Sequence, residues 1–437
     1  MKGSDEVGGD IDGRWGQASD RIPMLIIFAV VYAYLIIDKK RRAYAMAAGA
    51  VAAVVTGVIE PADVVYYINW NVMGIFAGTL ILADLFAQSR VPALCADYLV
   101  GKSGTVGRAI LLLCATSGLL STIVENVAVV LLIAPIALEI SRKQGTSPVP
   151  FLIGIAISSN LQGTATLMGD PPSMIMAGYE KLDFNDFFYH QGKPGIFFAV
   201  ELGAIVSLGV LYLIFRSNKQ PVSEVMKTSV QSWFPTWLLG VVVIGLALSP
   251  MIDPDFRWLG GTWTMVVAAG GLIWHAASRW GGSPLRRYDY NTTLFLAGVF
   301  VVVGGLEKSG LIEELAAAVS SAAGGEPLAL FLIVVWGSVV LSAFIDNVPY
   351  ITAMIPVAHQ AALDMGVNPL LMVFGLVVGS CLGGNITPFG ASANIVAVGM
   401  LRRGGREVGF MQFVKIGLPF TLVATAVGAA FLWFVWG

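Results

Sequence analysis

Long apolar segments separated by short polar stretches run along the whole chain. Most of them hold about 17–25 residues, the length that an α-helix needs to cross the hydrocarbon core of a bilayer. The alternation of single polar and apolar residues that marks a membrane β-barrel is absent. The pattern therefore predicts an all-α polytopic membrane protein of about ten spans. Single spans are expected at residues 22–38, 43–59, 68–88, 195–215, 233–251, 258–276, 290–306 and 413–436.

Two further apolar stretches, 109–140 and 328–361, carry a carboxylate followed by an asparagine at their centres, 125–126 and 346–347. Each arm has about 15 residues, which is short for a crossing of ~30 Å. Basic residues flank the first stretch on both sides, so it should enter and leave on one side of the membrane. We predict two re-entrant helical hairpins with these pairs at their tips. Two short spans in place of each hairpin would fit the charges equally well.

Residues 150–179 and 369–400 are apolar but are interrupted by glycines and small polar residues. In the first of them a proline pair, 171–172, follows the interruption, and proline suits the first position of a helix. We predict two broken helices. The unwound centre of each would offer backbone carbonyls to a cation, and the second half-helix would offer its N-terminal N–H groups to an anion. Glycine and serine that serve close helix packing explain part of the same pattern.

The two halves of the chain match at their polar, helix-breaking positions. Asn71 aligns with Asn291, an offset of 291 − 71 = 220, and Asn126 aligns with Asn347, an offset of 347 − 126 = 221. Equivalent spans would run in opposite directions, so we predict two inverted-topology repeats, an architecture of secondary transporters. The expected domains are an N-terminal tail (1–21), a first repeat with its preceding span (22–215), a cytoplasmic linker (216–232) and a second repeat (233–437).

Basic residues gather in alternate loops, at 39–42, 216–219, 279–287 and 402–406. Placing all of these loops in the cytoplasm alternates the single spans correctly and leaves both termini on the non-cytoplasmic side. The acidic start of the chain lacks the basic region of a signal peptide, so the first span should be retained. We therefore expect a multi-pass protein of the cell inner (plasma) membrane, in contact with the lipid bilayer.

Composition narrows the function classes. Only 12% of the 437 residues are charged, against roughly 25% in a soluble domain, and the net charge of −2 gives no reason to expect a nucleic-acid partner. The three cysteines show no metal-ligand spacing and no disulfide framework. The three histidines lie outside the matched motifs. No cofactor or metal site is expected, apart from Na⁺ or H⁺ as a coupling ion.

Three carboxylates, Glu125, Asp346 and Asp170, fall inside the interrupted stretches. A carboxylate at hydrocarbon depth is costly unless it is paired, solvated or neutral, so we predict that these three carry the coupling proton or cation. Glu125 and Asp346 could also cap the second hairpin arms. Asp84 and Glu201, nearer the ends of spans, are expected at the interface or in helix–helix pairs. Neutral ligands are expected from Asn126, Asn347, Ser159, Asn160, Thr164, Thr166, Asn385, Thr387, Ser392 and Asn394.

The strings at 163–172, 346–349 and 383–394 resemble the ion transporter superfamily, in the branch of arsenite pumps (ArsB), sodium/proton antiporters (NhaD) and the melanosomal P protein. The resemblance covers nearly the whole chain. More distantly, the hairpin tips resemble the Ser-Asn-Thr motifs of dicarboxylate/sodium symporters, although Glu125 and Asp346 replace the serine. The resemblance implies a homodimer whose transport domain moves against a scaffold domain by an elevator mechanism.

Together these features predict a secondary active transporter, not an enzyme, that couples a small inorganic ion to protons or sodium. The ion could be arsenite-like, another anion or sodium. A sodium-coupled di- or tricarboxylate (citrate-like) symporter and a passive anion channel of the same fold are the alternatives. An intramembrane aspartyl protease using Asp170 and Asp346 is disfavoured, because Leu167 replaces the first glycine of its Gly-x-Gly-Asp motif. The chain has no Gly-x₄-Gly-Lys-Ser/Thr string, so any ATPase would be a separate partner.

Overall fold

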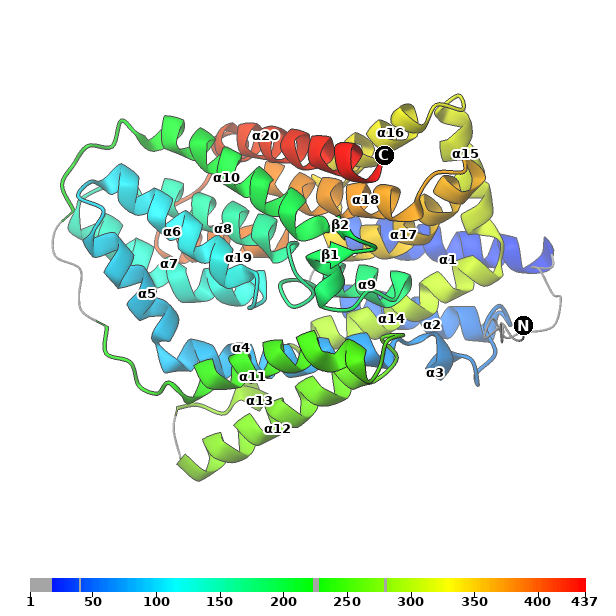
Figure 1. The fold of residues 1–437 in the computed structure, drawn as a ribbon, viewed down its shortest axis with the longest axis horizontal. Coiled ribbons are helices and arrows are strands. Elements are labelled where there is room, and N and C mark those ends of the chain that lie inside the picture. The colour runs from blue at the N-terminus through cyan, green and yellow to red at the C-terminus, as the bar shows by residue number, and fades with distance from the viewer. Residues whose placement is uncertain (1–17, 39–40, 223–227, 279–280) are drawn as a thin grey trace.

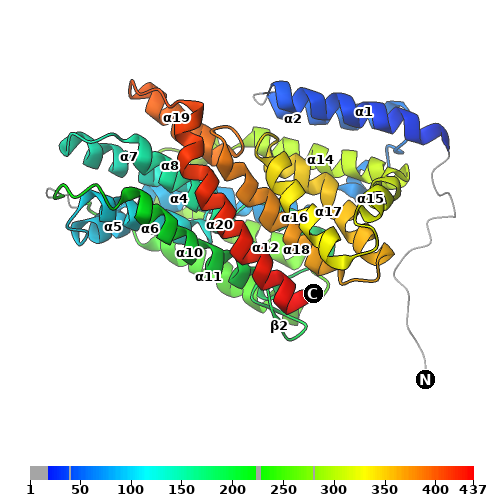
Figure 2. The ribbon, with the colours of Figure 1, turned by 90° about the horizontal axis from the view of Figure 1, so that it is seen from above.

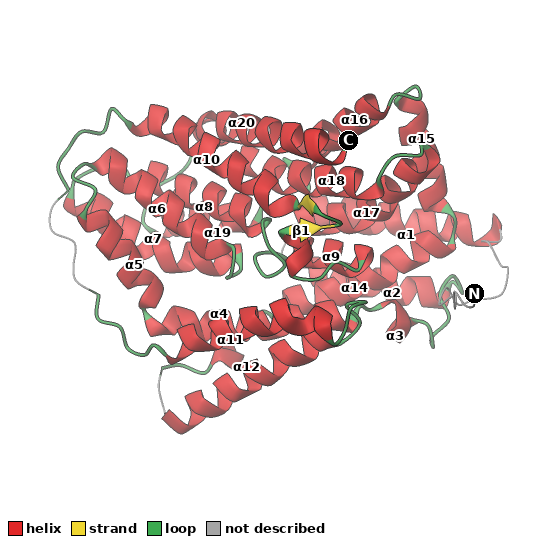
Figure 3. Ribbon diagram, in the orientation of Figure 1, coloured by secondary structure: helices red, strands yellow, loops and turns green. Residues whose placement is uncertain are grey.

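The computed structural model describes residues 18–38, 41–222, 228–278 and 281–437. Apart from one two-stranded hairpin, the described elements are helices, which confirms the predicted all-α class (Figure 3). Six described helices are long and apolar enough to cross a membrane, or up to seven if one bent pair counts as a span. The number of spans and the inverted relation of the two halves stay predictions. Residues 1–17 of the expected tail, Lys39, Lys40, Arg279 and residues 223–227 of the linker lie outside the described residues.

The first half of the chain contains ten α-helices among its described residues and a short β-hairpin. Their bounds are α1 Ala18–Ile37, α2 Arg42–Val55, α3 Val64–Tyr67, α4 Trp70–Ser89, α5 Val91–Gly101, α6 Val106–Ser121, α7 Asn126–Lys143, α8 Val149–Gly163, α9 Pro171–Glu180, β1 Tyr189–His190, β2 Lys193–Pro194 and α10 Ile196–Phe215, with a 3-10 turn, η2 Asn185–Phe187.

The second half also contains ten α-helices among its described residues, with two 3-10 turns and no strand. Its elements are α11 Phe234–Leu248, η3 Ser249–Met251, α12 Leu259–Ser278, α13 Pro284–Arg287, α14 Tyr290–Lys308, α15 Leu311–Ala322, α16 Pro327–Ser342, α17 Asn347–Asp364, α18 Pro369–Gly383, η4 Gly384–Ile386, α19 Ser392–Arg403 and α20 Phe410–Trp436.

Two helices longer than a single turn were not expected from the hydrophobic pattern. Helices α5 and α15 begin at Val91 and Leu311, 311 − 91 = 220 residues apart, so they occupy matching places in the two halves. Each follows a left-handed residue, Arg90 with φ 61° and Gly310 with φ 72°. Because they have only 11 and 12 residues, neither looks like a span in the sequence. Helix α15 meets α16 at a bend of 115°.

Both predicted helix interruptions are present as breaks between short helices. Helix α8 ends at Gly163, and α9 starts at Pro171 with Asp170 as its N-cap. A Cβ on Gly169 would lie 2.1 Å from the carbonyl oxygen of Gly163, so only glycine fits there. In the second half, a Cβ on Gly390 would lie 2.5 Å from the carbonyl oxygen of Gly384. The same close approach of two backbone segments therefore shapes both breaks.

The helices pack as two groups. Helix α4 packs against α11 and α12, and α2 packs against α14. The other group contains the pairs α6 with α8, α16 with α18 and α10 with α20. Figure 1 shows α4, α11 and α12 as a layer below α6, α8, α10 and α20. Seen from above, α1 and α2 lie at one edge beside α14 (Figure 2).

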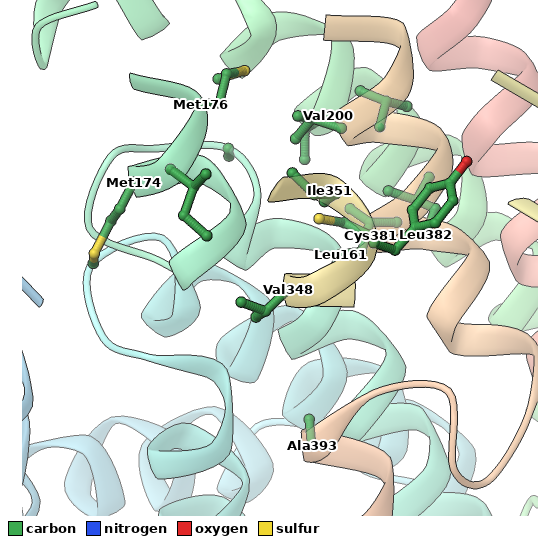
Figure 4. Packing of buried hydrophobic residues seen from close by; sticks show 14 of the residues in the cluster. Leu161, Met174, Met176, Val200, Val348, Ile351, Cys381, Leu382 and Ala393 are labelled. Carbon is green, nitrogen blue, oxygen red and sulfur yellow. The ribbon is translucent and has the colours of Figure 1, made fainter. Parts of the chain in front are cut away.

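A continuous apolar core surrounds the breaks. Leu161 of α8 and Ile351 of α17 are fully buried, as is Cys381 of α18. Figure 4 shows these side chains near Val348, the second residue of α17. The core therefore joins elements from both halves of the chain around the unwound segments, and the polar groups of those segments must find partners inside it.

Candidate functional site

The two hairpin tips have the same local construction. Residues 122–125 join α6 to α7, and residues 343–346 join α16 to α17. Glu125 Oε2 accepts a hydrogen bond from the backbone N–H of Ala128 at 3.0 Å. Asp346 Oδ1 accepts one from the backbone N–H of Val348 at 3.3 Å. Both carboxylates therefore cap the second hairpin arm, as one of the two sequence interpretations expected.

The tips and the helix breaks meet at one cavity of about 910 Å³, a size within the range of small-molecule sites. All three predicted coupling carboxylates line it. Four of the predicted neutral ligands also line it. These seven residues are Glu125, Asp170, Asp346, Asn126, Asn160, Asn347 and Ser392.

The remaining six predicted ligands do not line the cavity but lie behind it, where all six make hydrogen bonds. Thr387 Oγ1 donates to the carbonyl oxygen of Ala343 at 2.6 Å, which ties the second break to the second hairpin tip. Thr166 Oγ1 donates in the same way to the carbonyl oxygen of Thr122 in the first half. Asn394 Nδ2 donates to two backbone carbonyls of the second break, at 2.9 Å each. The six are Ser159, Thr164, Thr166, Asn385, Thr387 and Asn394.

A chain of side-chain amides connects the two halves. Asn126 Nδ2 donates to Asn160 Oδ1 at 3.0 Å. Asn160 Nδ2 then donates to Asn385 Oδ1 at 3.0 Å, and Asn385 Nδ2 donates to the carbonyl oxygen of Ile157 at 3.2 Å. Asn160 and Asn385 are both buried. This chain fixes the first hairpin tip and both broken helices relative to one another.

Arg42 also lines the cavity, although the basic run 39–42 predicts a cytoplasmic loop at this position. Its Nη1 lies 3.0 Å from Asp346 Oδ2, and its Nη2 donates to Thr292 Oγ1 at 2.9 Å. Nη1 also lies 3.5 Å from Ser392 Oγ, and the guanidinium carbon lies 5.1 Å from the centre of the Phe295 ring. No sequence signal distinguishes Arg42 from its three basic neighbours, because every partner lies at least 250 residues away.

Two further carboxylates at the cavity were not predicted as site residues. Asp289, the residue just before the predicted span 290–306, caps α14 by accepting from the backbone N–H of Thr292 at 3.0 Å. Asn69 caps α4 at the matching place, 289 − 69 = 220 residues earlier. Asp84 Oδ1 lies 3.6 Å from Arg287 Nη1. The repeated cap position would have been a usable signal for Asp289.

Acidic groups outnumber basic ones around the cavity. Five carboxylates and two guanidinium groups line it, an excess of 5 − 2 = 3 negative charges when all are ionised. Such a cavity attracts cations or protons, or an anion accompanied by them. Glu201, in contrast, lies away from the cavity and receives a hydrogen bond from Gln162 at 2.8 Å, which is the expected helix–helix pair. The seven charged lining residues are Glu125, Asp170, Asp346, Asp84, Asp289, Arg42 and Arg287.

The sequence matches the family described as citrate transporter (CitMHS) in two overlapping regions, residues 32–379 and 257–437. An uncharacterized transporter of Mycobacterium tuberculosis, Rv2684, is 30% identical over 418 residues, which are 93% of this chain and 96% of that protein. The P protein of Homo sapiens is 26% identical over 511 residues, which are 93% of this chain and 59% of that protein.

Two solved transporter structures resemble this fold. The YdaH transporter of Alcanivorax borkumensis superposes with a TM-score of 0.60 at 15% identity, covering 95% of this chain and 97% of that one. MtrF of Neisseria gonorrhoeae, described among antimetabolite efflux pumps, gives a TM-score of 0.55 at 13% identity, covering 97% and 96%. At these identities the likeness concerns the fold alone.

Proposed function

This chain belongs to the citrate transporter (CitMHS) family of membrane transporters, and from that premise we propose that it is a secondary active transporter coupling a small ion to protons. Membership of a transporter family identifies the chain as a carrier rather than an enzyme. The predicted place within the ion transporter superfamily is confirmed, with the P protein among its relatives. The chain is a multi-pass membrane protein.

One observation carries the proposal of coupling. Glu125 and Asp346 occupy equivalent hairpin tips, and both face the same cavity beside the broken helices. Broken helices of this kind bind substrates and coupling ions in secondary transporters, because their unwound carbonyls and half-helix N-termini are free to act as ligands. A carboxylate that holds charge in one state and a proton in another gives the cavity a means to exchange protons during transport.

We assign the coupling proton first to Glu125. The ion pairs among the described residues include Arg42 with Asp346 and Arg287 with Asp84, but none that involves Glu125. A carboxylate without a cationic partner is easier to protonate at hydrocarbon depth than a paired one. Asp170 is the second candidate, since it is buried and held by Ser173 and Thr164. In an alternative form of this proposal, the coupling ion is sodium instead of a proton.

One mechanism of movement and two substrate classes extend this proposal. Helices α6–α10 and α16–α20 would form the mobile transport domain, and α1–α4 with α11–α14 the scaffold of a homodimer, in an elevator-type cycle. The substrate would be an inorganic anion or, following the family's description, a citrate-like carboxylate carried with protons or sodium. A passive anion channel of the same fold is the competing function, because it would use the same cavity without concentrating its ion.

The experiment uses purified protein in liposomes that contain a pH-sensitive dye. Gradients of citrate, chloride, arsenite and sodium are imposed in turn, and lumenal pH is followed with and without a protonophore. We expect one of these ions to drive a proton flux in the wild type, and Glu125→Gln to remove it. Glu139→Gln, on the same helix in an i,i+4 pair with Lys143, is the matched control and should keep the flux. Ion movement without any proton flux, and without uptake against a gradient, would establish the channel instead.

A further inference from the structure

The contacts of Arg42 carry an inference about the substrate. Arg42 is the first residue of α2, yet its guanidinium reaches Asp346 at the tip of the second hairpin and Ser392 at the start of α19. Its side chain is 19% exposed and that of Asp346 is 12% exposed. The pair is therefore largely removed from water while it still faces the cavity.

A guanidinium that faces a cavity is suited to binding an anionic oxygen group. It carries five N–H donors in a plane and no acceptor, and its geometry matches a carboxylate or another oxyanion. Thr292 accepts a hydrogen bond from the guanidinium, and the ring of Phe295 lies against it. These two contacts fix the direction of its N–H groups before a ligand binds. Sodium gains nothing from such a group, and arsenite, which is an uncharged hydroxide at neutral pH, gains little.

We propose that Arg42 recognises an anionic oxygen group of the substrate, and that Asp346 occupies this position while the substrate is absent. The inference rests on the proposed transport function and narrows its substrate to carboxylates or inorganic oxyanions. Asp346 acts as an internal competitor, and the substrate displaces it from Arg42 on binding.

The surroundings of Asp346 allow this exchange. Its Oδ2 faces Arg42, whereas its Oδ1 accepts from the backbone N–H of Val348 on its own hairpin. When a ligand takes the place of Asp346 at Arg42, Asp346 keeps the hydrogen bond from Val348 and its position at the N-terminal end of α17, so its charge is still stabilised. Arg42 and Thr292 belong to α2 and α14, while Asp346 and Ser392 belong to the hairpin and the second broken helix. The exchange therefore changes the contact between the two groups of helices.

The test measures equilibrium binding of labelled citrate and labelled sulfate to the purified full-length protein, at one pH and one ionic strength. For one of the two anions we expect Arg42→Gln to weaken binding at least tenfold, and Arg42→Lys to weaken it less. Asp346→Asn should tighten the same binding several-fold because the competing charge is gone. Arg41→Gln is the matched control, since Arg41 is the adjacent arginine and its side chain is 73% exposed.

The outcomes separate this inference from the function it rests on. Equal binding of both anions by the wild type and Arg42→Gln, with a wild-type proton flux in liposomes, would overturn the role of Arg42 and leave coupled transport standing. Binding of neither anion by the wild type would overturn it as well. A thermal unfolding midpoint for Arg42→Lys close to that of the wild type shows that altered binding in this variant is not a folding defect.

Discussion

Asn160 and Asn385, 225 residues apart in the sequence, share a hydrogen bond of 3.0 Å between Nδ2 of the first and Oδ1 of the second. Asn160 Nδ2 also donates to the carbonyl oxygen of Cys381 at 2.7 Å. One broken helix from each half thus completes the hydrogen bonding of the other. The buried polar groups behind the cavity are therefore held by a contact between the two halves.

Removing one member of this amide pair should destabilise the protein. Asn160→Ala removes the donor to Asn385 Oδ1 and to the carbonyl oxygen of Cys381, at an expected loss of about 1–3 kcal/mol in unfolding free energy. Asn385→Ala should cause a similar loss. Because the two share one interaction, the double variant should lose less than the sum of the singles. Thermal or denaturant unfolding in detergent measures all three, and strictly additive losses would contradict the coupling.

Gly169 and Gly390, the glycines at the two helix breaks, should not tolerate substitution by alanine. Gly169→Ala places Cβ 2.1 Å from the carbonyl oxygen of Gly163 and 2.5 Å from that of Ser121, so backbone must move. We expect a loss of roughly 1–3 kcal/mol or more and a large fall in transport. Gly209→Ala on α10 is the matched control, because no atom lies within 4 Å of its added Cβ. Its unfolding midpoint should stay the same or rise.

The hydroxyl group of Thr387 should contribute more to stability than the volume of its side chain does. Thr387→Val keeps the shape but removes the donor to the carbonyl oxygen of Ala343, leaving that oxygen unpaired beside the second hairpin tip. We expect a loss of about 1–3 kcal/mol in stability and weaker substrate binding. Thr262→Val on α12, where the hydroxyl donates to the carbonyl oxygen of Trp258 one turn earlier in the chain, should change stability by no more than about 0.5 kcal/mol. Equal unfolding midpoints for Thr387→Val and Thr262→Val would show that the hydrogen bond between Thr387 and Ala343 does not stabilise the protein.

Neutralising Asp346 should separate binding from coupling. Asp346→Asn frees Arg42 from its charged partner but keeps a side chain that can cap α17, so folding should be retained. We expect substrate-driven proton flux in liposomes to fall at least tenfold while the protein remains monodisperse. A variant with wild-type flux would remove Asp346 from the coupling mechanism.

Asp253, in the loop before α12, predicts a pH dependence of stability. Burial by itself raises the pKa of Asp253, but hydrogen bonds from the backbone N–H groups of Leu259, Trp258 and Arg257, with the Arg257 charge, lower it below its ordinary value. A depressed folded pKa contributes stability above the unfolded pKa of about 3.9, which is lost as pH falls through the folded value.

The measurement compares the wild type with Asp253→Asn. The difference in their unfolding midpoints should be constant between pH 7 and pH 5 and should shrink below about pH 4, where the unfolded carboxylate takes up its proton. A gap that closes already between pH 7 and pH 6 would mean that Asp253 does not have a lowered pKa.

Much of this arrangement could be predicted from local sequence. The polar pairs at 125–126 and 346–347 interrupt apolar runs, and interruptions of that kind mark hairpin tips because charged groups avoid lipid. Pro171 and Pro172 fix where α9 restarts. The helices α5 and α15 escaped prediction because their 11 and 12 residues are too short to resemble spans.

The sequence could not reveal which polar residues face the cavity. Thr387 and Asn394 look like ligands in the sequence, but their donors are used by backbone carbonyls of the break and the hairpin tip. Arg42 belongs to the basic run 39–42, which predicts a cytoplasmic loop. Its side chain nevertheless contacts Asp346 and Ser392, which lie 304 and 350 positions away in the sequence. Such pairings depend on how distant helices are brought together, and no short pattern encodes them.

The interleaving of the two halves has a consequence for biosynthesis. Helices α2 and α4 pack against α14 and α12, and α8 packs against α19, so partners on the two sides emerge far apart in time during translation. Until the second half has been inserted, Asn160 has no contact with Asn385, and its amide must stay near water or a chaperone. The polar interior therefore closes only late in synthesis, and a nascent chain stalled before residue 385 would be an early target for membrane proteases.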